Sequence, residues 1–185
     1  MRRLAAVAVL AVVAGCAATS VYRDTDIQIS SAAAFDPARY VGLWYEIARY
    51  PVPFQTGCVA ATATYSLRPD GTIGVVNACK EGTPDGPVRQ IEGRAEVTGP
   101  GRLNVRFDAV PFVKSPYWVL WTDDTYETAV VGVPSGRAGW VLSRTPTIRP
   151  DRWRAALEVL DFNGYDIARL ISGGQPGAEA ISLSR

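Results

Sequence analysis

Few side chains in this sequence could act as catalytic groups, nucleophiles or metal ligands. The chain has 185 residues and no histidine, which excludes a Ser-His-Asp triad, a Cys-His pair and a histidine-ligated metal. Its only thiols belong to Cys16, Cys58 and Cys79, which could be acylated or joined in a disulfide. A net charge of +1 gives no electrostatic basis for binding nucleic acid. No metal and no cofactor are expected.

The segment that ends at Cys16 has the layout of a targeting sequence. Two cationic residues, Arg2 and Arg3, precede an apolar run over Leu4–Ala14 that is too short to span a bilayer. This order, with small residues before the cysteine, resembles a bacterial lipoprotein signal, which implies cleavage before Cys16 and acylation of its thiol and amino group. In lipoproteins of this kind, an aspartate after the cysteine implies retention in the inner membrane. Ala17 at this position therefore favours the periplasmic side of the outer membrane. An ordinary secretory signal with a chance cysteine is the alternative.

The other two cysteines are expected to form a disulfide, because an exported protein lies in an oxidising compartment. A hairpin that turns at Pro69-Asp70 places Cys58 and Cys79 within two residues of opposite each other, which is compatible with a cross-strand disulfide. A reactive thiol pair is the alternative, but the CxxC spacing of such pairs is absent.

These residues must be positioned by strands, since alternating apolar runs and turn signals fill the middle of the chain. Pro69-Asp70-Gly71 and Gly99-Pro100-Gly101 are two of the turns. Such spacing is typical of a sandwich or an up-and-down barrel. The eight expected strands cover residues 43–50, 58–68, 72–80, 88–98, 102–109, 117–123, 127–133 and 139–144.

After Pro150 the apolar period changes to that of a helix. Trp153, Ala156, Leu157 and Leu160 fall on one face, which predicts a helix that packs on the side of the strands and ends at Asn163-Gly164.

Three short motifs occur in order along the chain: Gly42-Leu43-Trp44, then Thr122-Asp123-Asp124 with Tyr126, then Leu142-Ser143-Arg144-Thr145-Pro146. Together they resemble the three signatures of the lipocalin family, most of all the bacterial outer-membrane lipoprotein lipocalins and apolipoprotein D. The resemblance implies an eight-stranded up-and-down antiparallel barrel with one C-terminal α-helix packed on its side. It implies structural roles for Gly42, Trp44, Asp123 and Arg144, with Arg144 lying over the indole of Trp44.

The chain is therefore expected to divide into a signal peptide and three further parts. These are residues 1–15 (signal peptide), 16–34 (acylated cysteine and flexible tether), 35–175 (lipocalin domain) and 176–185 (tail).

Strand alternation, with Trp44 placed inside, predicts which side chains line the barrel. The register could slip by one on the second and sixth strands, where both faces are apolar. The predicted lining is mostly apolar with a few polar groups, as in a small-molecule pocket. The predicted ligand-binding residues are Glu46, Thr64, Asn77, Phe107, Tyr117, Val119, Trp121, Val131 and Trp140.

Three functions remain open at this level. The first is an outer-membrane-anchored lipocalin, not an enzyme, that binds and stores or transports a fatty acid or lysophospholipid. The loops Pro51–Gly57 and Pro111–Val113 expose Phe and Val around the mouth, which suits the uptake of a lipid from a membrane or the closing of a lid. The second is a lipocalin-fold enzyme that uses Glu46 as an acid or base, and the third is a packed envelope lipoprotein without ligand. A homodimer is left open.

Overall fold

The computed structural model describes residues 20–177, and within them nine strands form one sheet. The eight main strands each lie within two residues of their predicted limits. The strands are β1 (Gly42–Arg49), β2 (Cys58–Leu67), β3 (Ile73–Glu81), β4 (Val88–Gly99), β5 (Arg102–Phe107), β6 (Ser115–Thr122), β7 (Thr128–Gly132), β8 (Gly139–Ser143) and β9 (Ile171–Ser172). The helices are α1 (Pro37–Tyr40), η1 (Pro53–Gln55), α2 (Pro150–Phe162) and η2 (Ile167–Arg169).

Turn residues set the strand limits where the sequence predicted them. Asp70 accepts hydrogen bonds from the backbone N–H and the hydroxyl of Thr72, and Gly71 adopts a φ of +79°. Such a backbone conformation favours glycine. The β2–β3 hairpin therefore turns at the Pro69-Asp70-Gly71 motif.

The sheet closes on itself into a barrel. Consecutive strands pair antiparallel from β2 to β8, and β1 pairs with both β8 and β2. This is the predicted eight-stranded up-and-down barrel. The short strand β9 pairs with β1 at Ala48 and Arg49, on the edge of β1 that β2 leaves unpaired there.

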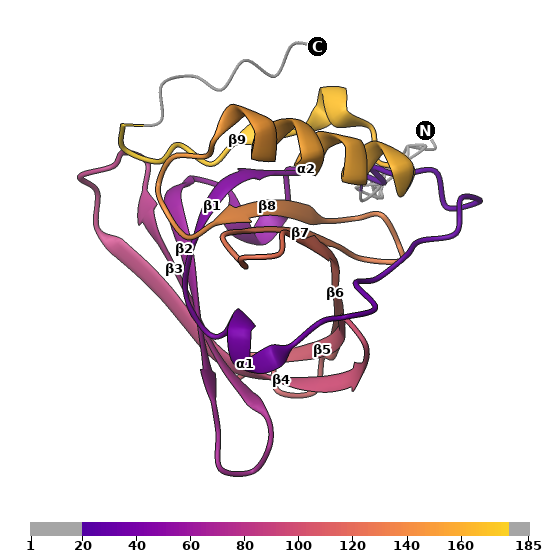
Figure 1. Cartoon of the computed structure of the whole chain (residues 1–185). Helices are drawn as coiled ribbons and strands as arrows, with labels where there is room; N and C mark the ends of the chain where they lie inside the picture. Colours follow the sequence, from indigo (N-terminus) through magenta and orange to yellow (C-terminus); the bar gives the residue numbers. More distant parts are fainter. Residues whose placement is uncertain (1–19, 178–185) are drawn as a thin grey trace, which may run out of the picture.

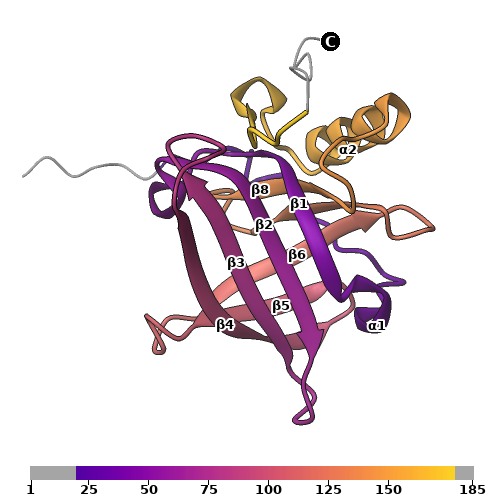
Figure 2. The same cartoon turned by 90° about the vertical axis from the view of Figure 1, so that its left-hand side faces the viewer.

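The barrel has a closed end and an open end. Helix α1 leads directly into β1, so it lies at the same end as the β2–β3, β4–β5 and β6–β7 loops, as Figure 2 shows. The β1–β2, β3–β4, β5–β6 and β7–β8 loops surround the open end, which we call the mouth. Helix η1 is part of the β1–β2 loop and therefore lies at the mouth.

Helix α2 packs on the outside of the barrel, across β7 and β6, as predicted (Figure 1). Pro150 occupies its first turn, and Asn163 and Gly164 end it, with a φ of +81° at the glycine. Its buried face, Trp153, Ala156 and Leu160, meets a second apolar core on the outer wall of the barrel.

The prediction of a flexible tether up to residue 34 is wrong for residues 20–34. Tyr22 and Arg23 are buried, with 6% and 7% exposure. The backbone N–H of Tyr22 donates to Gly136, that of Asp24 to Gly164 and that of Ala32 to Val119. The low content of large apolar residues suggested a solvated segment, but the buried Tyr22 and Arg23 and these backbone hydrogen bonds hold it against the barrel. Cys16 and the predicted signal peptide, residues 1–15, lie outside the described residues.

Candidate functional site

A large cavity occupies the open half of the barrel. Its volume is about 1140 Å³, which lies just above the usual range for small-molecule pockets, about 300–1,000 Å³. Its walls come from β1, β2, β3, β4, β5, β6 and β8, and the mouth loops complete it. The apolar lining includes Ala63, Val75, Val105, Phe107, Trp140 and Leu142.

Five of the nine predicted ligand-binding residues line this cavity. They come from five different strands, so the barrel brings together side chains that are far apart in the sequence. These residues are Glu46, Asn77, Phe107, Tyr117 and Trp140.

Two further predicted residues point into the barrel but lie outside the cavity lining. Val119 and Val131 are fully buried in the core at the closed end, together with Trp44 and Leu103. The prediction that they face inward holds, but they do not line the cavity. Alternation fixes which face a side chain occupies. It does not fix how far along the barrel axis the packed core extends.

The remaining two predicted residues are on the wrong face, and a β-bulge accounts for each. On β2, Ala60 has a φ of +51° and the register with β3 shifts between Val59 and Thr62, so Ala63 and Tyr65 face inward and Thr64 is exposed. A bulge adds one residue to a strand and reverses the alternation beyond it.

On β6 the register with β7 shifts between Val119 and Trp121. Trp121 consequently packs with Leu120 in the outer core beneath α2 rather than in the cavity. These are the two strands on which the sequence left the register open.

Tyr65 and Tyr117 form the floor of the cavity, and Tyr40 lies beneath them in the closed-end core. The hydroxyl of Tyr117 lies 2.8 Å from that of Tyr40 and 2.8 Å from that of Tyr65. Burial raises the pKa of Tyr65 to about 12 and those of Tyr40 and Tyr117 well above the usual value. The floor is therefore neutral at any physiological pH. Tyr117, one of the predicted ligand-binding residues, packs against the closed-end core as well as lining the cavity.

The Glu46 carboxylate belongs to a chain of polar groups that fastens the mouth loop to the barrel. Arg49 donates to it at 2.8 Å and Gln55 at 2.7 Å, and the indole of Trp140 donates to the Gln55 side-chain oxygen at 3.0 Å. Since an indole N–H only donates, this contact fixes which way the Gln55 amide points. Burial raises the pKa of Glu46, and the charge of Arg49 opposes that shift.

Asn77 offers the cavity an acceptor without a partner. Its side-chain oxygen is buried and makes no hydrogen bond within the described residues. A buried acceptor left unsatisfied is destabilising by about 1–3 kcal/mol. A ligand that places a hydroxyl or N–H beside Asn77 would therefore gain a hydrogen bond to this oxygen.

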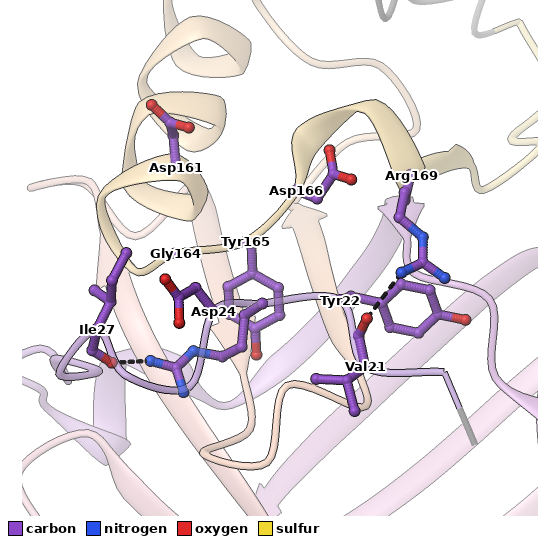
Figure 3. A pocket seen from close by; sticks show the side chains of 10 residues that line it. Val21, Tyr22, Asp24, Ile27, Asp161, Gly164, Tyr165, Asp166 and Arg169 are labelled. Atoms are coloured by element: carbon purple, nitrogen blue, oxygen red, sulfur yellow. Dashed lines mark hydrogen bonds between the residues drawn. The ribbon is translucent and has the colours of Figure 1, made fainter. Parts of the chain in front are cut away.

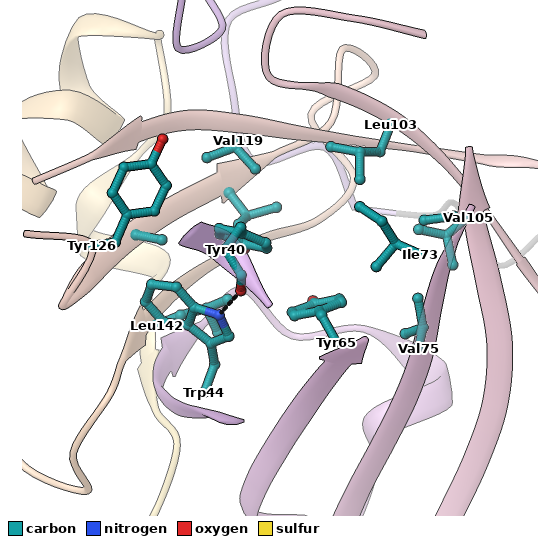
Figure 4. Close-up of a cluster of buried hydrophobic side chains, with 13 residues drawn as sticks. Tyr40, Trp44, Tyr65, Ile73, Val75, Leu103, Val105, Val119, Tyr126 and Leu142 are labelled. Carbon is teal, nitrogen blue, oxygen red and sulfur yellow. Dashed lines mark hydrogen bonds between the residues drawn. The ribbon is translucent and has the colours of Figure 1, made fainter. Parts of the chain in front are cut away.

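Trp44 and Arg144 close the opposite end of the barrel. Trp44 is fully buried and donates its indole N–H to the Tyr40 carbonyl at 2.8 Å, as Figure 4 shows. The Arg144 guanidinium lies 3.8 Å from the centre of the Trp44 ring. Gly42 has a φ of +102°, and a Cβ there would lie 3.1 Å from Arg144. The same guanidinium donates to the carbonyls of Arg39, Tyr40, Val41, Leu43 and Tyr126.

Asp123, from the middle motif, organises the β6–β7 turn. It accepts from the backbone N–H groups of Thr125 and Thr128 and pairs with Arg152 of α2 at 3.2 Å. Burial alone would raise its pKa, but these hydrogen bonds, with that from the Thr125 hydroxyl, hold the pKa below the usual range. Asp123 therefore ties the barrel to the helix and is not a ligand group.

The predicted disulfide between Cys58 and Cys79 is confirmed. Their Cα atoms lie 5.5 Å apart, on β2 and β3. It joins the two strands at the mouth, opposite the Pro69-Asp70-Gly71 turn.

An antiparallel eight-stranded barrel, closed at one end by an arginine over a tryptophan and hollow at the other, defines a class of ligand-binding barrel. The family model described as a lipocalin-like domain matches residues 35–175. The chain belongs to this family.

Its relatives include bacterial and animal proteins. It is 40% identical over 146 residues to the outer membrane lipoprotein Blc of Escherichia coli K12, which covers 78% of this chain and 81% of that protein. Mouse apolipoprotein D is 34% identical over 151 residues, with 76% and 77% covered. Insecticyanin from the tobacco hornworm Manduca sexta shares the fold, with a TM-score of 0.63, 21% identity and coverage of 79% and 84%.

Two further observations concern only residues 20–177. No cluster of three or more acidic or cysteine side chains there is arranged to hold a metal ion. None of the helices in this range is long and apolar enough to cross a membrane.

Proposed function

We propose that this protein is a lipocalin anchored to the outer membrane that binds a fatty acid or lysophospholipid in its barrel and stores or transports it. The cavity of about 1140 Å³, apolar in its walls and open at the mouth, is the observation that carries the proposal. The relationship to a protein named outer membrane lipoprotein Blc supports the location.

The acyl chain would lie between the tyrosine floor and the mouth, against Val75, Val105, Phe107 and Trp140. Each methylene removed from water contributes about 0.8 kcal/mol, and ordering the chain offsets much of that gain. We therefore expect dissociation constants in the micromolar range or slightly below, about −8 to −9 kcal/mol.

The head of the lipid would point outward. Arg89 and Arg137 line the cavity near the mouth and favour an anionic head there, whereas the charge of the Glu46 carboxylate is already paired with Arg49. Asn77 adds a preference, because its free acceptor suits the glycerol hydroxyl of a lysophospholipid and has no counterpart in an ionised fatty acid.

Attachment to the membrane would come from acylation of Cys16. Removal of Arg2 and Arg3 with the signal leaves a net charge of −1, so acyl chains, rather than surface charge, would hold the protein to the periplasmic face.

The alternative of a lipocalin-fold enzyme depends on Glu46 as its acid or base. Glu46 is held by Arg49 and Gln55, and a carboxylate fixed in two hydrogen bonds is poorly placed to exchange a proton with a substrate. We therefore favour binding over catalysis.

Tryptophan emission tests the proposal, because Trp140 lines the cavity and Trp121 does not. Delipidated protein titrated with palmitate or lysophosphatidylcholine should show a saturable change at one site per chain. The change should persist in Trp121→Phe and shrink in Trp140→Phe, both checked for folding by circular dichroism. No saturable change with either lipid would overturn the proposal.

A further inference from the structure

Exposed apolar side chains surround part of the mouth. We call Phe54, Val110, Phe112 and Val113 the mouth rim; they lie in the β1–β2 and β5–β6 loops. Phe112 is 98% exposed and Phe54 is 66% exposed. Apolar groups gathered at one end of a molecule in this way are typical of a surface that meets a partner.

The first described residues lie at this same end. Ser20 lines the cavity beside the mouth. The backbone N–H of Tyr22 donates to Gly136 in the β7–β8 loop at 2.7 Å, and the Tyr22 hydroxyl donates to the Pro51 carbonyl in the β1–β2 loop. The chain therefore joins the barrel at the mouth and not at the closed end.

Several contacts hold this segment in place. The Tyr22 ring stacks on Tyr50 with ring centres 5.0 Å apart, and the Arg169 guanidinium lies 4.4 Å from the centre of the Tyr22 ring. Arg169 also donates to the Val21 carbonyl at 2.8 Å, as Figure 3 shows. The guanidinium of Arg23 donates to the carbonyls of Pro134 and Asn163. The segment is therefore held against the barrel from residue 21 onward.

Only three residues lie between Cys16 and Ser20, so four Cα–Cα steps join them. Even fully extended, this length spans at most about 14 Å. The closed end is farther away, since the strands that separate it from the mouth, such as Gly42–Arg49, are roughly 25 Å long. Acyl chains on Cys16 would therefore keep the mouth, rather than the closed end, next to the membrane surface.

We propose that the mouth rim rests on the lipid bilayer that holds Cys16, so that the cavity opens directly toward the lipid. The proposal rests on the anchor proposed above. Two independent features support a bilayer as the partner: the short chain between Cys16 and the barrel, and the apolar rim at the end where that chain emerges. A lipid could then pass between bilayer and cavity without its acyl chain crossing water.

The orientation can be measured with the chain from Cys16 onward, which contains every described residue. With Cys58 and Cys79 bonded, Cys16 is the one free thiol of this chain and can be coupled to a maleimide phospholipid in phosphatidylcholine vesicles. Phe112→Trp places a reporter on the rim, and Leu67→Trp places a matched one at the closed end, where Leu67 is 57% exposed. Dibrominated phosphatidylcholine quenches tryptophans that reach the bilayer.

The emission added by Phe112→Trp should be lost in brominated vesicles, and the emission added by Leu67→Trp should be retained. Loss from Leu67→Trp alone, equal loss from both, or no loss from either would overturn the proposal. Chemical coupling replaces natural acylation, and the assay needs no lipid in the barrel. Failure of the anchor in cells, or of ligand binding, would therefore be seen separately.

Discussion

At the scale of single residues, Asn77 is the side chain with the clearest bearing on ligand choice. Its buried oxygen has no hydrogen-bond partner within the described residues. Asn77→Leu should weaken lysophosphatidylcholine by about fivefold to tenfold, since one hydrogen bond is lost. Palmitate binding should change less, because the leucine adds apolar surface. Calorimetric titration of both lipids measures the two effects, and an equal change for both would contradict the assigned role.

Asp123 makes stability depend on pH in a defined direction. Its pKa is lowered in the folded state, so its contribution is full above the unfolded value of about 3.9 and is lost as the pH falls through the folded value. Asp123→Asn should reduce the free energy of unfolding at pH 7 by about 1–3 kcal/mol. The difference from wild type should shrink as the pH falls below the unfolded value, as urea unfolding at pH 7 and at acid pH can show. A difference that is constant with pH would rule out this linkage.

At the scale of elements, the hairpin of β2 and β3 carries the disulfide. Cys58 and Cys79 are 21 residues apart, and a crosslink over such a loop contributes about 3 kcal/mol by restricting the unfolded chain. The double variant Cys58→Ser, Cys79→Ser should lose about that much stability in equilibrium unfolding. Wild type under reducing conditions should lose the same amount, and an unchanged midpoint in both would contradict the estimate.

The strands themselves could be predicted, because turn motifs such as Pro69-Asp70-Gly71 mark their ends and alternation marks their faces. The disulfide and the helix after Pro150 followed from the same patterns. The inward positions of Thr64 and Trp121 were wrong because each lies beyond a bulge. The bulge on β2 depends on a positive φ at Ala60, and alanine gives no sign of it in the sequence.

The depth of the cavity could not be predicted from the sequence either. Val119 and Val131 alternate correctly, yet they belong to the closed-end core. How far that core extends depends on how Tyr40, Tyr65 and Tyr117 meet across the barrel. Such contacts between distant strands leave no local pattern. Gln55 was missed for the same reason, since its role depends on Glu46 and Trp140.

At the scale of the whole molecule, the anchor is the first feature to test. Cys16→Ser removes the thiol that would be acylated, so the protein should move from the membrane to the soluble periplasmic fraction. Cell fractionation with an immunoblot measures this, and Cys58→Ser with Cys79→Ser serves as a control that keeps Cys16. Retention of the Cys16→Ser protein in the outer membrane would indicate another means of attachment.

Whether a lipid occupies the barrel can be tested with one pair of variants on β2. Ala63 lines the cavity and Thr64, the next residue on β2, faces outward. Native mass spectrometry after gentle purification should find one lipid per chain in wild type and in Thr64→Phe. In Ala63→Phe the added ring displaces about two methylenes, so occupancy should fall with an affinity loss of about tenfold. Wild-type chains that carry no lipid, or equal occupancy in both folded variants, would contradict the account.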